Sequence, residues 1–124
     1  MNDDATLSGL RVLVIEDNFL AAMSMKSILE RLCCEVVGPV ATVEDGERAV
    51  GQESVDVGIL DVNLFGGTSA AIAEALRDHH RPVVFVTGYS SPAMLPPSFA
   101  NAPTLKKPVD DQSVRRALLA AIAR

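Results

Sequence analysis

The chain has 124 residues, of which 48% are hydrophobic and 22% charged, and its formal net charge is -5. This composition predicts a single ordered, soluble domain over residues 1–124, with no room for a separate output domain. An acidic chain without a basic stripe argues against nucleic-acid binding, and the absence of a long apolar run or a basic leader argues against membrane insertion and export. We therefore expect a cytoplasmic protein.

The predicted elements begin with a strand at 10–15, a nearly continuous apolar run of the kind found where helices cover both faces of a sheet. A helix follows from near Asn18, with an inward stripe at Ala21, Met25, Ile28, Leu29 and Leu32. The second strand, 35–41, contains Gly38-Pro39, which indicates an edge strand or a bulge.

Beyond this strand, Thr42 and Asp45 resemble a capping box and predict a short helix that ends near Glu53. A third strand at 55–60 leads to a helix over 69–78, whose expected buried stripe consists of Ile72, Ala75 and Leu76. A fourth strand follows at 82–86.

The segment 90–103 is where the alternation calls for a fourth helix, but Pro96 and Pro97 would each cost roughly 3 kcal/mol in a helix interior. We predict a short or mobile segment there. A strand at 104–107 and a helix from Asp110 complete five strand-helix units. This order predicts an α/β fold, with a parallel sheet between two layers of helices.

Polar side chains lie at the carboxyl ends of four of the predicted strands. Glu16 and Asp17 follow the first strand, Asp61 the third and Thr87 the fourth, and Lys107 ends the fifth. Because ligands bind open α/β sheets at the carboxyl ends of the strands, these groups should share one pocket. Three carboxylates are a hard-oxygen site suited to Mg²⁺, and a threonine and a lysine beside them suit the stabilisation of a transferred phosphoryl group.

Each of these residues also has an ordinary structural explanation. Asp17 or Asn18 could cap a helix, Thr87 could start a turn, and Lys107 could close a strand. Their arrival at successive strand ends favours the functional interpretation. The adjacent cysteines at 33 and 34 suit neither a disulfide framework nor a zinc site, and we interpret them as small apolar residues, with a redox switch as the alternative.

The sequence resembles the receiver domain of two-component response regulators, and the resemblance covers nearly the whole chain. It rests on Val14-Ile15-Glu16-Asp17, Ile59-Leu60-Asp61-Val62-Asn63, Val86-Thr87-Gly88 and Lys107-Pro108. The resemblance implies a flavodoxin-like, doubly wound five-stranded fold in which Asp61 accepts a phosphoryl group from a sensor histidine kinase. It further implies that Thr87 and Lys107 hold the phosphoryl oxygens and that the Lys107-Pro108 bond is cis.

By the same resemblance, Asp17, Asp61 and the backbone carbonyl of Asn63 would hold Mg²⁺ directly, whereas Glu16 would act through water. An aspartyl-nucleophile phosphatase would also use Mg²⁺, but it needs an acid two residues after the nucleophile, where this chain has Asn63. We therefore do not expect an enzyme that acts on other substrates.

Two positions depart from the usual receiver pattern: Phe65 replaces a proline, and Thr104 replaces the aromatic switch residue. With Phe-Val-Thr-Gly-Tyr at 85–89, the chain looks like the alphaproteobacterial subgroup called FATGUY receivers, which is associated with kinases of the HWE type. Thr104 cannot act as an aromatic switch, and Tyr89 is the nearest aromatic residue that could take its place.

The leading hypothesis is a single-domain response regulator of a phosphorelay that signals through a protein-binding surface formed by 90–103, the fifth strand and the last helix. Its downstream protein partner is not identified by the sequence. We expect the segment 90–103 to be mobile without phosphate and to order with it. A phosphate sink and an unphosphorylated adaptor that competes for a kinase or regulator are the alternatives.

Overall fold

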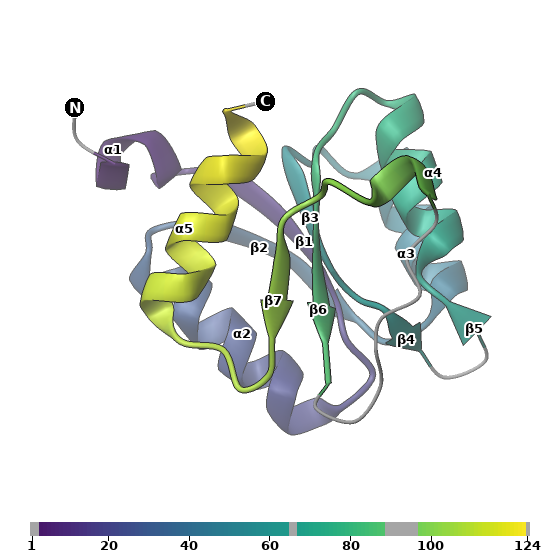
Figure 1. Ribbon diagram of the computed structural model, residues 1–124, viewed down its shortest axis with the longest axis horizontal. Helices are drawn as coiled ribbons and strands as arrows, with labels where there is room; N and C mark the ends of the chain where they lie inside the picture. Colours follow the sequence, from purple (N-terminus) through teal and green to yellow (C-terminus); the bar gives the residue numbers. More distant parts are fainter. Residues whose placement is uncertain (1–2, 65–66, 89–96, 124) are drawn as a thin grey trace.

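The computed structural model describes residues 3–64, 67–88 and 97–123 (Figure 1). Its centre is a parallel sheet formed by β1 (Arg11–Ile15), β2 (Glu35–Val40), β3 (Val57–Asp61), β6 (Val83–Thr87) and β7 (Thr104–Lys106). The five strands lie in the order β2-β1-β3-β6-β7, which is the flavodoxin-like arrangement predicted from the sequence.

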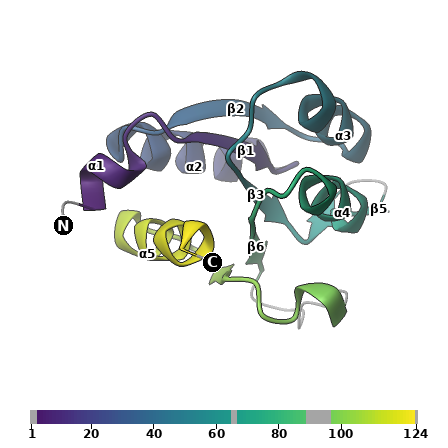
Figure 2. The same cartoon turned by 90° about the horizontal axis from the view of Figure 1, so that it is seen from above.

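Helices cover both faces of this sheet: α1 (Asp3–Leu7), α2 (Phe19–Arg31), α3 (Val43–Gln52), α4 (Ala70–Asp78) and α5 (Asp111–Ile122). Figure 2 shows α1, α2 and α5 on one face and α3 and α4 on the other. No helix within the described ranges is long and apolar enough to cross a membrane.

Alternate residues of the strands face the two helical layers, because successive side chains of a strand point to opposite faces of the sheet. On β1, Val12 and Val14 belong to the hydrophobic core beneath α2 and α5. Leu13 and Ile15 belong to the core beneath α3 and α4. The continuous apolar run in the sequence therefore has a simple cause, which is burial of both faces.

The second strand is both an edge strand and an irregular one, as Gly38-Pro39 indicated. β2 lies at the border of the sheet, and its register with β1 shifts between Leu13 and Ile15. Gly38 has a φ of +95°, and a Cβ there would lie 2.8 Å from the backbone nitrogen of Val40. Only glycine fits this close approach of the backbone to itself.

Both ends of α3 lie where the sequence predicted them. Thr42 accepts a hydrogen bond from the Asp45 backbone N–H (3.1 Å), and Glu53 follows the last helical turn.

In each of two other helices, one alanine of the buried stripe differs from the prediction. Ala22 is buried in α2 where Ala21 was expected, and Ala73 is buried in α4 where Ala75 was expected. Ala22 and Ala73 are buried while Ala21 and Ala75 are half-buried, and small side chains of this kind give a weak signal in the sequence.

Two small elements were not predicted. α1 places the fully buried Leu7 in the core beneath α5. A hairpin of β4 (Asn63–Leu64) and β5 (Gly67–Thr68) follows β3. In the segment expected to be short or mobile, residues 89–96 lie outside the described residues. The described remainder begins with a single 3-10 turn, η1 (Pro97–Phe99).

Candidate functional site

The parallel pairing of the strands brings the carboxyl ends of β1, β3, β6 and β7 together at one edge of the sheet, called the acidic edge below. Ile15 pairs with Leu60, so the next residues of the two strands, Glu16 and Asp61, lie side by side. On the other side of β3, Asp61 pairs with Val86 of β6, and Thr87 pairs with Lys106 of β7. The order of the strands therefore decides which side chains meet.

Lys107 connects the two buried carboxylates at this edge. Its Nζ lies 2.7 Å from Oε1 of Glu16 and 3.1 Å from Oδ2 of Asp61. The backbone N–H of Lys107 donates to the Thr87 carbonyl (2.9 Å), which fixes the start of the loop after β7. Glu16 is 8% exposed and Asp61 is 7% exposed, so each carboxylate needs a partner to offset its loss of hydration.

Burial and neighbouring charge shift two pKa values in this cluster. The pKa of Glu16 is raised, chiefly because burial disfavours its charged form, and the adjacent Asp61 adds to the effect. Hydrogen bonds from Lys107 and from the Asn18 backbone oppose this shift. For Lys107, burial acts to lower the pKa, but the contacts with Glu16 and Asp61 outweigh it and raise the pKa. Lys107 is therefore held as the cation.

Three carboxylates of this cluster have the chemistry of a magnesium site. The ligand oxygens of Glu16, Asp17 and Asp61 lie within 4.8 Å of one another, and Asp17 is exposed. Mg²⁺ prefers oxygen ligands and keeps several waters, so a partly open acidic edge suits it. Both oxygens of Glu16 already have partners, Lys107 Nζ and the Asn18 backbone N–H (3.1 Å). The expectation that Glu16 contacts the ion through water stays a prediction.

The other predicted site residues are placed as follows. Thr87 is half-buried at the end of β6, beside the strand that ends at Asp61. Asn63 is the first residue of the β4–β5 hairpin. Thr104 is exposed at the start of β7, and its hydroxyl donates to the Ala102 carbonyl (3.3 Å). Tyr89 lies outside the described residues. The Lys107-Pro108 peptide bond is cis, as expected.

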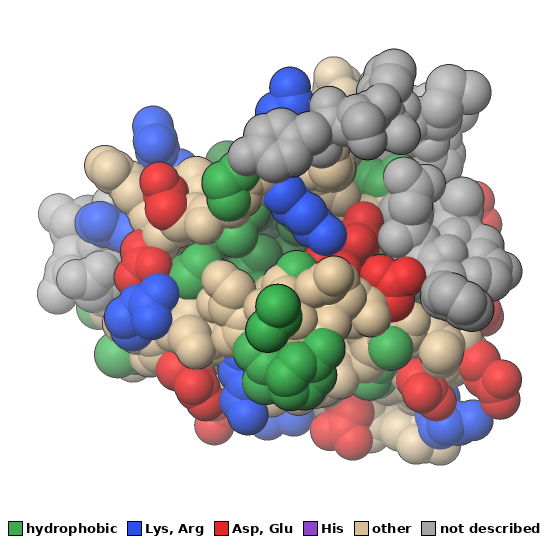
Figure 3. All heavy atoms as spheres, turned by 90° about the horizontal axis from the view of Figure 1, so that it is seen from below, with side chains coloured by type: hydrophobic (Ala, Val, Ile, Leu, Met, Phe, Trp, Pro, Cys, Tyr) green, Lys and Arg blue, Asp and Glu red, His purple; other side chains and the backbone are tan. Residues whose placement is uncertain are grey.

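A hydrophobic feature beside the acidic cluster was not found from the sequence. Among the described residues, the exposed large hydrophobic side chains are Phe19 (72%) and Leu20 (77%), at the start of α2. Figure 3 shows hydrophobic side chains protruding next to acidic and basic groups on this face of the molecule. The sequence signal that could have shown this feature is Phe19-Leu20, two large apolar residues outside the inward stripe predicted for this helix.

The sheet order and the strand-end cluster together define a receiver domain. The family model of the response regulator receiver domain matches residues 12–119, and the chain belongs to this family.

Known relatives agree with this assignment. The chain is 37% identical to SdrG from Sphingomonas melonis Fr1, whose solution structure superposes with a TM-score of 0.82 and with complete coverage (100%) of both chains. It is 30% identical to the sensory transduction protein LytT of Bacillus cereus over 88% of this chain and 46% of LytT. It is 32% identical to the phyllosphere-induced regulator PhyR of Methylorubrum extorquens over 63% of this chain and 30% of PhyR.

The chain thus spans less than half the length of these two curated relatives. The similarity to SdrG and PhyR matches the FATGUY subgroup expected from the sequence.

Proposed function

We propose that this receiver domain accepts a phosphoryl group on Asp61 from the phosphohistidine of a sensor histidine kinase and signals through a change in its protein-binding surface. The observation that carries the proposal is the Lys107 ammonium, which lies within 3.1 Å of Asp61 and 2.7 Å of Glu16 at an open edge of the sheet. A buried nucleophilic carboxylate beside a fixed cation is what transfer of a negatively charged group requires.

The transfer is a displacement at phosphorus. A carboxylate oxygen of Asp61 forms the new O–P bond, the P–N bond of the phosphohistidine breaks, and the imidazole keeps the bonding electron pair. In this proposal Lys107, already paired with Asp61, contacts a phosphoryl oxygen, and the hydroxyl of Thr87, at the end of β6, donates to another. Mg²⁺ held at Asp17 and Asp61 would supply further neutralisation of the phosphoryl charge.

Phe19 and Leu20 support a protein, rather than a small molecule, as the physiological phosphodonor. Exposed aromatic and aliphatic side chains are typical anchors of protein interfaces, and these two begin the helix that follows the acidic pair. A histidine kinase docked there would bring its phosphohistidine to Asp61. The similarity to the FATGUY receivers makes an HWE-type kinase the first one to test.

The downstream partner would bind where the sequence places the output surface, on the segment 90–103, β7 and α5. This surface adjoins Lys107, so a change in the contacts of Lys107 on phosphorylation is transmitted along the backbone of β7. We propose no turnover of other substrates, because the position two residues after Asp61 is Asn63, which cannot protonate a leaving group.

The test is intact mass after incubation with Mg²⁺ and acetyl phosphate, for the wild type, Asp61→Asn and a control variant, Asp45→Asn. Asp45 is an exposed carboxylate on α3 and does not belong to the cluster. A labile phosphoryl adduct on the wild type and on Asp45→Asn, but not on Asp61→Asn, is expected. If the folded wild type binds Mg²⁺ but gains no adduct, the proposal fails and an unphosphorylated adaptor becomes the better account.

A phosphate sink would pass this first test, and a second one separates it from a signalling module. Phosphorylated and unphosphorylated protein are each used to capture partners. A signalling module is expected to retain a protein other than a kinase in its phosphorylated form. Capture of a kinase alone would favour the sink.

A further inference from the structure

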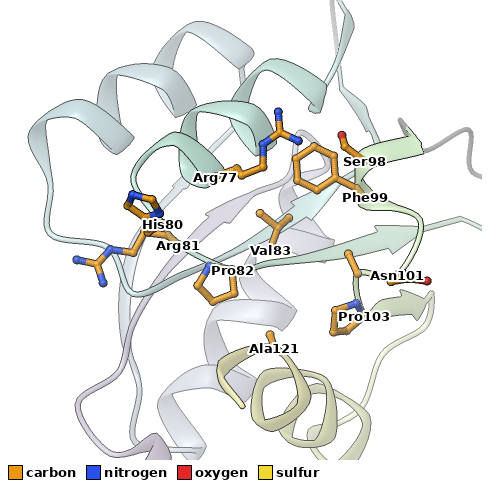
Figure 4. A pocket seen from close by; sticks show the side chains of 11 residues that line it. Arg77, His80, Arg81, Pro82, Val83, Ser98, Phe99, Asn101, Pro103 and Ala121 are labelled. Atoms are coloured by element: carbon orange, nitrogen blue, oxygen red, sulfur yellow. The ribbon is translucent and has the colours of Figure 1, made fainter. Parts of the chain in front are cut away.

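An open pocket of about 510 Å³ lies at the amino ends of the strands, on the side of the sheet opposite the acidic cluster. It lies at the amino ends of β6 and β7, between the end of α4, the turn η1 and the end of α5 (Figure 4). The pocket contains none of the residues assigned to phosphoryl transfer. Its size is within the range of pockets that bind small molecules or peptide side chains.

Apolar residues form the centre of this pocket. Figure 4 shows Pro82 and Val83 at its centre, with Phe99, Pro103 and Ala121 around them. Phe99 itself is held in place by an edge-on contact with the ring of Phe85, at a centroid distance of 5.7 Å. The ring is therefore anchored in the core and is only 7% exposed, so the accessible apolar surface beside it is that of the half-buried Pro82 and Pro103.

Cationic side chains border these apolar residues. The Arg77 guanidinium lies over the ring of Phe99, 5.2 Å from its centroid, and Arg81 and His80 line the same pocket. Among the described residues that line the pocket, none is acidic. Stacking uses the face of a guanidinium and leaves its N–H groups, which lie in the plane, available to donate to an anion.

The backbone that carries these cations is fixed by a helix-ending motif. The N–H of Arg81 donates to the Leu76 carbonyl (2.8 Å), and the N–H of His80 donates to the Arg77 carbonyl (2.9 Å). His80 has a φ of +58°, the left-handed conformation that such an ending requires. The backbone positions of the two arginines are thus fixed by the end of α4, and of their side chains Arg77 is further held by its contact with Phe99.

We propose that this pocket binds an acidic peptide segment of a partner protein, with carboxylates paired to Arg77 and Arg81 and an adjacent apolar side chain packed on Pro82 and Pro103. Charge complementarity selects this ligand, because the pocket concentrates cations in a chain whose net charge is -5. The same net charge disfavours a long polyanion such as RNA, which would meet acidic surface beyond the pocket. Ser98, Phe99 and Pro103 of the pocket also belong to the output surface proposed above, so the pocket is tested in the unphosphorylated protein.

The experiment uses a fluorescein-labelled peptide of alternating glutamate and leucine, and a control peptide with glutamine in place of glutamate. Fluorescence anisotropy gives the affinity, and backbone amide shifts in NMR spectra locate the site. We expect the acidic peptide to shift the resonances of α4, η1 and the end of α5, and added salt to weaken its binding. The glutamine peptide should bind less tightly.

The decisive comparison uses two double variants with the same change in charge. In Arg77→Gln/Arg81→Gln, the affinity is expected to fall by about tenfold or more, since two charge-assisted contacts are lost. In the control, Arg48→Gln/Arg116→Gln, both arginines are exposed and lie outside the pocket, and the affinity should stay close to that of the wild type.

Several outcomes would overturn the proposal. These are the absence of peptide binding by folded protein, an equal loss of affinity in both double variants, and shifts that map to another face. Binding of an RNA oligonucleotide in preference to the peptide would also contradict it. Self-association that weakens with added salt and disappears in Arg77→Gln/Arg81→Gln would also contradict the proposal. The pocket would then be occupied by the acidic edge of a second copy of the chain. The same titration with Asp61→Asn is expected to give an unchanged affinity, so the result does not depend on the phosphoryl-transfer proposal.

Discussion

Lys107 balances the charges of the acidic edge, because it contacts Glu16 and Asp61 at once. Replacement by Gln is expected to have two opposite effects. Mg²⁺ affinity should rise by roughly tenfold, because a competing cation is removed from the carboxylates. The yield of the Asp61 adduct should fall, because a phosphoryl oxygen loses its cation. Isothermal titration calorimetry and intact mass measure the two effects.

The neighbouring Lys106 provides the matched control for this prediction. It is the exposed last residue of β7, directly before Lys107, and Lys106→Gln removes the same charge from the chain. Equal Mg²⁺ affinities for the two variants would contradict the view that Lys107 acts through its contacts within the cluster.

The two adjacent cysteines differ sharply in environment. Cys33 is exposed, whereas Cys34 is buried and its sulfur lies 3.6 Å from the Leu7 carbonyl. Burial, with a smaller effect of Cys33, raises the pKa of Cys34 from 9.0 to about 11. At pH 8 roughly one Cys34 in a thousand would be a thiolate, the form that reacts. These environments favour a structural role for Cys34 over the redox switch.

Thiol labelling tests this difference. In native protein at pH 8, iodoacetamide is expected to modify Cys33 first and Cys34 only after unfolding, and Cys33→Ser should remove the fast reaction. The neutral Cys34 thiol contributes stability that is fully present below pH 9.0 and is lost as the pH rises through about 11. Labelling of Cys34 at the rate of Cys33 would show that the core opens readily.

At the scale of the element, α2 has two separate roles. Its inner face packs Met25, Ile28 and Leu29 into the core, while Phe19 and Leu20 at its start remain exposed beside the acidic cluster. The double variant Phe19→Ser/Leu20→Ser is expected to lower phosphorylation by a histidine kinase by about tenfold, in line with the loss of two interface anchors. Phosphorylation by acetyl phosphate should stay near the wild-type level.

Radiolabelled phosphotransfer from the kinase and intact mass with acetyl phosphate measure these two rates on one protein preparation. A loss in both assays would mean that the substitutions disturb the site itself. A loss in neither would place the docking surface elsewhere.

Local signals explain which elements were predicted and which were not. The inner strands β1, β3 and β6 are nearly continuous apolar runs, and the polar residues at their carboxyl ends, such as Glu16 and Asp61, are brought together by the topology. α1 carries a single buried leucine, Leu7, and the strands of the β4–β5 hairpin have two residues each, so neither has a periodicity to detect. The pocket around Arg77 and Phe99 comes from segments far apart in the sequence, and no local pattern shows that they meet.

At the scale of the whole molecule, α1 extends the core beyond the strand-helix units. Leu7 has no exposed surface and packs in the same core as α2 and α5. Leu7→Ala is expected to lower the free energy of unfolding by about 2–5 kcal/mol, the usual cost of such a truncation in a core. Urea denaturation measures the change, and the wild-type slope should be kept.

Leu20→Ala is the matched control, since it makes the same chemical change at a residue that is 77% exposed. Its effect on stability should be within about 0.5 kcal/mol of zero. A similarly small effect of Leu7→Ala would mean that α1 detaches from the domain without cost.

The position of α1 and of the end of α5 has a practical consequence for biosensor work. Both lie at the amino ends of the strands, while the acidic cluster lies at the carboxyl ends (Figure 1). Anchoring the protein to a chip through a tag that precedes α1 would leave the acidic edge facing the flowing analyte. Anchoring through a tag that follows α5 would crowd Ala121, which lines the cationic pocket. The choice of anchor therefore decides whether a captured partner can reach the cationic pocket, while the acidic edge stays accessible with either anchor.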